Sequence, residues 1–153
     1  MLDTSPSPND PARELRELLA AGRFREALEA FRRAAPSPAR PEVAILAATA
    51  ATRVGELSLA RELARAAEQQ FTTRADADGR MRTANLLGAI AFEQGNLTEA
   101  EAGFGRALEL ARQLDDGQMA ARTSNNLASV AHLRGSTDRA LSLYRGALLE
   151  YQR

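Results

Sequence analysis

A glycine followed five residues later by an alanine recurs four times in this chain of 153 residues, at Gly22/Ala27, Gly55/Ala60, Gly95/Ala100 and Gly135/Ala140. Each copy has a second alanine twelve residues after the glycine. The ninth residue is aromatic in three copies (Phe31, Phe104 and Tyr144) and is Ala64 in the second. The glycines are 33, 40 and 40 residues apart. Self-similarity at such a spacing predicts a supersecondary unit that has been copied and stacked.

The repeated unit is predicted to be a pair of helices. From Ala12 onward the sequence has a helical pattern, and no stretch of any length shows the alternation typical of a strand. Because glycine readily adopts the left-handed conformation that ends a helix, each glycine marks the turn within a pair. The expected helices span 11–21 and 24–35, 41–54 and 57–71, 80–94 and 98–114, and 119–134 and 137 to the end, with loops at 72–79 and 115–117.

Polar residues at the expected helix starts have the pattern of caps. Asn9 or Asp10 before Pro11 provides an N-cap and a first-turn proline. Thr98 with Glu101 fits a capping box, which supports a helix that starts there.

Two acidic segments fall between hairpins. The segment Asp76-Ala77-Asp78-Gly79 resembles part of a calcium loop, but Arg74 and Asn85 occupy places that require acidic ligands. We therefore interpret this segment, and Asp115-Asp116-Gly117, as turns that cap the following helix.

The domain organisation follows from the repeats. Residues 1–10, which contain Ser5-Pro6-Ser7-Pro8, are expected to form a flexible leader, and residues 11–153 a single domain. The repeat units within this domain are expected at 11–40, 41–79, 80–117 and 118–153. No apolar run is long enough to span a membrane and no signal peptide opens the chain, so we expect a cytoplasmic protein. A periplasmic location is the alternative if a signal or lipid anchor has been removed.

Composition argues against several classes of function. The 20 basic residues balance 20 acidic ones, so no net field attracts nucleic acid or a membrane surface. The chain has no cysteine, no serine on a strand-to-helix elbow, and a single histidine, His132. We therefore expect no enzymatic activity, no cofactor, no metal, no nucleic-acid partner and no membrane insertion.

Small residues precede each glycine at two positions where helices would cross. The seventh residue before the glycine is Leu15, Ala48, Gly88 or Ala128, and the fourth is Leu18, Ala51, Ala91 or Ala131. The chain thereby resembles the tetratricopeptide repeat family. The segments 85–88 and 125–128 are similar to the longer repeats of kinesin-light-chain type and of many bacterial regulators. The resemblance covers residues 11–153, although the family's usual tryptophan or tyrosine early in the first helix is missing.

The resemblance implies an all-α, right-handed solenoid of about four hairpins, whose first helices line a concave groove. The lining would come from residues ten, six and three before each glycine: Ala12, Arg16 and Leu19; Ile45, Thr49 and Thr52; Asn85, Ala89 and Phe92; Asn125, Ser129 and His132. One turn further out it would come from Asn9, Glu42, Arg82 and Arg122.

The function that the resemblance implies is the binding of a peptide or protein segment in this groove. Asn85 and Asn125 would hold the backbone of an extended peptide, since an amide both donates and accepts hydrogen bonds. Arg82 and Arg122 would pair with an acidic side chain or a terminal carboxylate. For all four residues a solvated helix face is the alternative, and for Asn126 it is a buried amide that bonds between neighbouring helices.

The last expected helix has a full apolar stripe that includes Leu141, Leu148 and Tyr151. An apolar stripe of this size seldom stays exposed to water. A fragment of a longer repeat protein, a homodimer through this helix and a docked partner are three explanations. The alternative functions are therefore an oligomerisation or assembly unit that uses this surface, or the sensor fragment of a larger bacterial regulator.

Overall fold

The computed structural model of the chain describes residues 10–34 and 38–152, and these residues form eight helices and no strand. In order they are α1 (Pro11–Ala20), α2 (Phe24–Ala34), α3 (Pro41–Val54), α4 (Leu57–Thr73), α5 (Ala77–Glu93), α6 (Leu97–Gln113), α7 (Gly117–Leu133) and α8 (Thr137–Tyr151). The predicted all-helical class and the four hairpins are confirmed. Nearly all of the expected leader, residues 1–9, lies outside the described residues.

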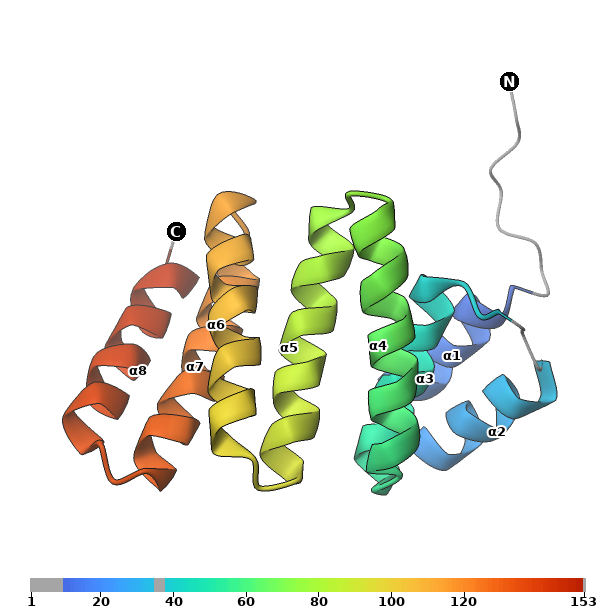
Figure 1. Cartoon of the computed structure of the whole chain (residues 1–153), viewed down its shortest axis with the longest axis horizontal. Helices are drawn as coiled ribbons and strands as arrows, with labels where there is room; N and C mark the ends of the chain where they lie inside the picture. Colours follow the sequence, from blue (N-terminus) through green and yellow to red (C-terminus); the bar gives the residue numbers. More distant parts are fainter. Residues whose placement is uncertain (1–9, 35–37, 153) are drawn as a thin grey trace.

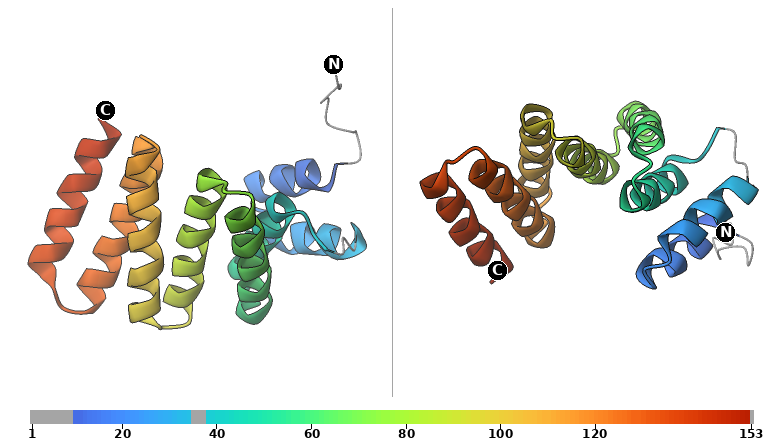
Figure 2. Two further views of the ribbon diagram at one scale, coloured as in Figure 1. Left: turned by 45° about the horizontal axis from the view of Figure 1, so that its top comes forward. Right: turned by 90° about the horizontal axis from the view of Figure 1, so that it is seen from below.

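The four hairpins follow one another along the long axis of the molecule, from α1–α2 at one end to α7–α8 at the other (Figure 1). The axes of the hairpins turn along the row, so that α4 and α5 are seen nearly end-on in a view that shows α7 and α8 from the side (Figure 2). The result is a twisted stack in which each helix pair packs on the next.

The odd-numbered helices form the inner layer of this stack. Consecutive members of the series α1, α3, α5 and α7 contact one another, whereas no two even-numbered helices come into backbone contact within the described residues. Because the inner elements lie closer together than the outer ones, the side formed by the odd-numbered helices is concave.

The repeated glycines make the turn within each hairpin. Their φ angles are 72°, 88°, 75° and 75°, in the left-handed region that is costly for residues with a Cβ. A Cβ added at any of them would meet no other atom within 4 Å. Backbone conformation, and not crowding, therefore requires glycine here.

The turn between α4 and α5 is shorter than predicted. Helix α4 continues to Thr73, and α5 begins at Ala77 rather than at residue 80. The reason is a cap: the Asp76 carboxylate accepts a hydrogen bond from the Gly79 backbone N–H at 2.9 Å, so Asp78 and Gly79 lie in the first turn of α5. Asp116 caps α7 in the same way, through the Met119 N–H at 2.9 Å. The interpretation of both acidic segments as caps is confirmed.

The predicted capping box at Thr98 is wrong by two residues. Asn96 is the N-cap of α6, and its side-chain oxygen accepts from the Glu99 N–H at 3.1 Å. The Glu99 carboxylate in turn accepts from the Asn96 side-chain amide at 3.1 Å. Thr98 lies inside the first turn, where its hydroxyl accepts a hydrogen bond from Arg134.

The repeated alanines lie where the helices cross. The four alanines that stand five residues after each glycine are between 0% and 3% exposed. Phe104 fills the space beside Gly88, but Phe31 is only half-buried and Tyr144 is 44% exposed. Tyr144 differs because, among the described residues, no further helix follows α8 to cover it.

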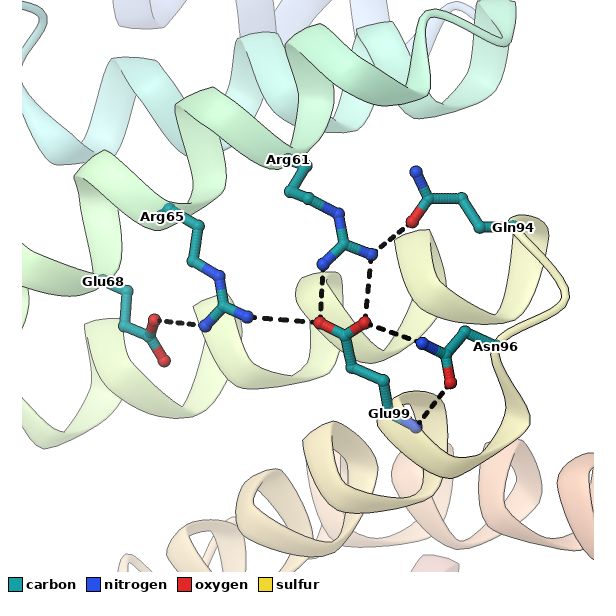
Figure 3. A network of polar contacts seen from close by, with 6 residues as sticks. All are labelled: Arg61, Arg65, Glu68, Gln94, Asn96 and Glu99. Atoms are coloured by element: carbon teal, nitrogen blue, oxygen red, sulfur yellow. Dashed lines mark hydrogen bonds and ion pairs between the residues drawn. The ribbon is translucent and has the colours of Figure 1, made fainter.

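Ion pairs join the hairpins along their outer side. Glu99, at the start of α6, accepts from Arg61 at 2.6 Å and from Arg65 at 3.2 Å, and both arginines belong to α4 (Figure 3). Arg61 also donates to the side chain of Gln94. Similar pairs join Arg32 of α2 to Glu56, and Glu101 of α6 to Arg139 of α8.

Each helix in the described part of the chain is too short, or too polar, to cross a membrane.

Candidate functional site

The concave face carries a strip of half-buried side chains from α3, α5 and α7. Thr49, Ala89 and Ser129 stand at the same repeat position, six residues before a glycine, and each is half-buried. The hydroxyl groups in this strip are already bonded within their own helices. Thr49 donates to the Ile45 carbonyl at 2.9 Å, and Ser129 donates to the Asn125 carbonyl at 3.1 Å. The side chains along the strip are therefore small, and their hydroxyl donors are already used within their own helices.

Asn85 bonds to the neighbouring inner helix. Its side-chain oxygen accepts a hydrogen bond from the Asn126 amide at 3.1 Å and a longer one from the Thr123 hydroxyl at 3.5 Å. Asn126 thus makes the interhelical bond that the alternative interpretation of that residue describes. The bond couples α5 to α7 and leaves only the Nδ2 donor of Asn85 free of partners among the described residues.

Asn125 occupies the same repeat position as Asn85, forty residues later, but its side chain is not engaged. The amide of Asn125 is half-buried and makes no hydrogen bond to any described residue. Both its donor and its acceptor are therefore available to a ligand. The two amides, which the sequence makes equivalent, differ in what they can still bind.

Arg82 and Arg122, which stand at the same repeat position, also differ. Arg82 donates to Asp78, one turn earlier on α5, at 2.7 Å, and this hydrogen bond raises the pKa of the Arg82 guanidinium. Arg122, forty residues later, is exposed and forms no ion pair within residues 10–34 and 38–152. Arg122 is thus the groove arginine whose charge is open to an incoming carboxylate.

Phe92 and His132 stand at equivalent positions near the carboxyl ends of α5 and α7. Phe92 is half-buried and packs against the cluster that contains Phe104 and Leu127. His132 is exposed. The structure therefore gives Phe92 a packing role, and it leaves His132 at the edge of the strip.

A hollow of about 300 Å³ lies at the opposite end of the concave side, where α1, α3 and the start of α5 meet. Its walls include five of the predicted groove positions (Ala12, Arg16, Glu42, Ile45 and Arg82). They also include five residues outside the predicted groove positions: Leu46, Phe71, Asp76, Asp78 and Gly79. The pattern of the acidic segment 76–79 predicts only a helix cap. Its repeat position, at the start of an inner helix, is the sequence signal that could have placed it in this hollow.

This fold defines a class of protein: a helical repeat protein whose inner helices form the concave face. The comparison with family models agrees, because the tetratricopeptide repeat model matches residues 79–148. Residues 79–148 therefore belong to the tetratricopeptide repeat family, and the hairpins α1–α2 and α3–α4 extend the same architecture toward the N-terminus.

Two solved structures are similar to this chain. BtubC (BKLC) from P. vanneervenii is 24% identical with a TM-score of 0.73, over 90% of this chain and 59% of that chain. MamA MSR-1 C2 is 17% identical with a TM-score of 0.41, over 94% of this chain and 95% of that chain. This chain thus spans less than two thirds of the length of BtubC, and the likeness to BtubC concerns the fold. No curated protein matches the chain.

Proposed function

We propose that the protein is a non-catalytic interaction module that binds an extended segment of a partner protein along the concave face of α3, α5 and α7. The observation that carries this proposal is the side-chain amide of Asn125, which lies half-buried in the groove without a partner among the described residues. An amide in this state can donate to a peptide carbonyl and accept from a peptide N–H, so it holds a main chain of any sequence.

Arg122 adds a preference for negative charge. It stands one helical turn from Asn125 and has no acidic partner in the described chain, whereas Arg82 is held by Asp78. A hydrogen bond between a guanidinium and a carboxylate is about twice as strong as one between neutral groups. The preferred ligand is therefore an extended peptide with an acidic side chain, or a terminal carboxylate, close to the residue that Asn125 binds.

The small side chains of the strip suit such a ligand. Thr49, Ala89 and Ser129 leave room for a backbone to lie against the inner helices, and the hydroxyls of Thr49 and Ser129 are already satisfied. Family membership of residues 79–148 supports a protein ligand, because repeats of this architecture form extended binding surfaces.

The test uses the intact chain and a phage-displayed library of random linear peptides. Asn125→Ala should weaken binding of a selected peptide by about tenfold, since the two lost amide hydrogen bonds are worth about 0.5–1.5 kcal/mol each. Arg122→Gln should weaken acidic peptides selectively, and amidating a terminal carboxylate should reproduce that loss. Calorimetric titration measures both effects.

The matched control is Gln69→Ala, which removes an exposed amide from α4 on the outer side of the stack. It should bind every selected peptide with unchanged affinity. Asn85→Ala is a poorer test, because it also breaks the bond to Asn126. Wild-type affinity in both Asn125→Ala and Arg122→Gln would refute the proposed groove.

A further inference from the structure

Helix α8 has an apolar face that no described residue covers. Leu141 is 48% exposed, Tyr144 44%, Leu148 59% and Tyr151 55%, and they follow the spacing of residues on one side of a helix. Leu149, beside them, is 63% exposed. We call these five residues the α8 face. A contiguous apolar surface of this kind marks an interaction site.

Equivalent positions in the preceding repeat show how such a face is covered. Tyr144 and Leu148 stand forty residues after Phe104 and Leu108, which are 2% and 8% exposed. Phe104 and Leu108 are covered because α7 packs on α6, with Met119, Ala120 and Leu127 in the same apolar cluster. The α8 face therefore continues an interface that the fold already uses between α6 and α7.

The environment of a residue equivalent to Tyr151 shows which side chains can pack against that ring. Tyr151 stands eighty residues after Phe71, which is 3% exposed at the end of α4. The Phe71 ring lies against Gly79, in the first turn of α5, so closely that a Cβ at Gly79 would collide with the ring. A helix that covers Tyr151 in the same way needs glycine in its first turn.

A second copy of this chain does not offer that surface. The inner helix at its free end is α1, where Glu14 and Glu17 stand at the repeat positions of Leu127 and Val130. Both glutamates are exposed and pair with Arg33 and Arg13. Packing them on the α8 face would remove charges from water against apolar side chains, which is unfavourable. Pairing of α8 with another α8 would pack two outer helices on each other, and no two outer helices come into backbone contact in the described part of the stack.

We propose that the α8 face docks an amphipathic helix of a separate protein, antiparallel to α8, in the way that α5 covers α4 and α7 covers α6. The docked helix carries glycine in its first turn, opposite Tyr151, and aliphatic residues on the same face over the next two turns. These aliphatic residues contact Leu148 and Tyr144. This site is separate from the groove, and it accepts a helix where the groove accepts an extended chain.

The chain carries its own reporter for this site. It contains two tyrosines and no tryptophan, and both tyrosines, Tyr144 and Tyr151, belong to the α8 face. Tyrosine emission therefore reports this face alone. A synthetic peptide with the α5 sequence, residues 77–93, has the required chemistry and contains neither tyrosine nor tryptophan.

In the experiment the intact chain is titrated with this peptide while tyrosine emission and acrylamide quenching are followed. We expect a saturable emission change and at least a tenfold loss of affinity in Leu148→Glu. Leu133→Glu, at an equally exposed leucine on α7, should bind like the wild type, and a peptide with Gly79→Leu should bind at least tenfold more weakly. Leu148→Glu should leave binding of groove peptides unchanged.

A second version of the experiment reduces the entropic cost of association between the peptide and the protein. The same 17-residue sequence is fused behind Arg153 through a Gly/Ser linker, which raises its effective concentration to about the millimolar range. Both tyrosines should then become protected from acrylamide. Unprotected tyrosines in the fusion, together with no response to the free peptide, would overturn the proposal. Concentration-dependent self-association that Leu148→Glu abolishes, measured by sedimentation, would assign the α8 face to a second copy and also overturn it.

Discussion

Gly88 and Gly103 lie where α5 and α6 cross, and the absence of side chains there sets the distance between the two helices. A Cβ added at Gly103 would lie 2.8 Å from the Cα of Gly88, a backbone atom that cannot turn aside. A Cβ added at Gly105, two residues later on the same helix, would meet no atom within 4 Å. A methyl group would therefore collide with the neighbouring helix at Gly103 but not at Gly105.

Gly103→Ala should destabilise the protein by about 1–3 kcal/mol, because the hairpin must open to admit the added carbon. Gly105→Ala should stabilise it by up to about 1 kcal/mol, because alanine favours the helix and nothing obstructs it. Urea unfolding followed by circular dichroism measures both changes. Equal effects of the two substitutions would show that α5 and α6 do not approach closely at Gly103.

Single residues also show what the repeat pattern does not specify. Alanine recurs at fixed positions after each glycine, and these alanines are buried because helix crossings depend on small residues close together in the sequence. The pattern treated Phe104 and Tyr144 as equivalent, although Phe104 is 2% and Tyr144 44% exposed. Burial of an aromatic ring at this position depends on the next hairpin, which a local pattern does not contain.

At the scale of the helices, the sequence correctly predicts that each helix exists, but it places the first residues of some helices wrongly. Helix α5 begins three residues earlier than expected because Asp76, and no later residue, bonds to the N–H of Gly79. Helix α6 begins at Leu97 because Asn96 and Glu99 bond reciprocally. Thr98 and Asn96 are both acceptable N-caps by type, and only the backbone geometry selects between them.

The ion-pair cluster around Glu99 predicts a pH dependence of stability. The hydrogen bond from Arg61 lowers the pKa of Glu99 below its ordinary value of 4.5, against a smaller opposing effect of burial. A carboxylate whose pKa falls on folding stabilises the native state above its unfolded pKa, and this contribution disappears as the pH falls through the folded pKa. Acidification through this range should therefore weaken the protein.

Glu99→Gln should remove part of that dependence. We expect a loss of less than about 1 kcal/mol at neutral pH, since the side chains of the pair are only partly shielded from water. The difference between variant and wild type should shrink as the pH is lowered below 4.5. Glu62→Gln, an exposed carboxylate on α4 without an ion pair among the described residues, is the control. A variant difference that does not change with pH would contradict this role of Glu99.

At the scale of the whole molecule, the stack presents two surfaces of different chemistry. The concave face carries polar side chains, of which those of Asn125 and Arg122 make no hydrogen bond or ion pair among the described residues; the α8 face is apolar and exposed. The positions before each glycine placed Asn85 and Asn125 at equivalent points, and this much follows from the repeat alone. The bond from Asn126 to Asn85 depends on how α5 and α7 are offset, which no single repeat encodes.

The central claim is that ligands lie along the inner helices, and photo-crosslinking tests it most directly. A peptide selected on the intact chain, with one benzophenone residue at its centre, is irradiated in the complex and the adducts are mapped by mass spectrometry. We predict adducts on α3, α5 and α7 at or beside Thr49, Ala89 and Ser129, and their loss in Asn125→Ala. Adducts confined to the even-numbered helices, including Leu148 and Tyr151 of the α8 face, would contradict it.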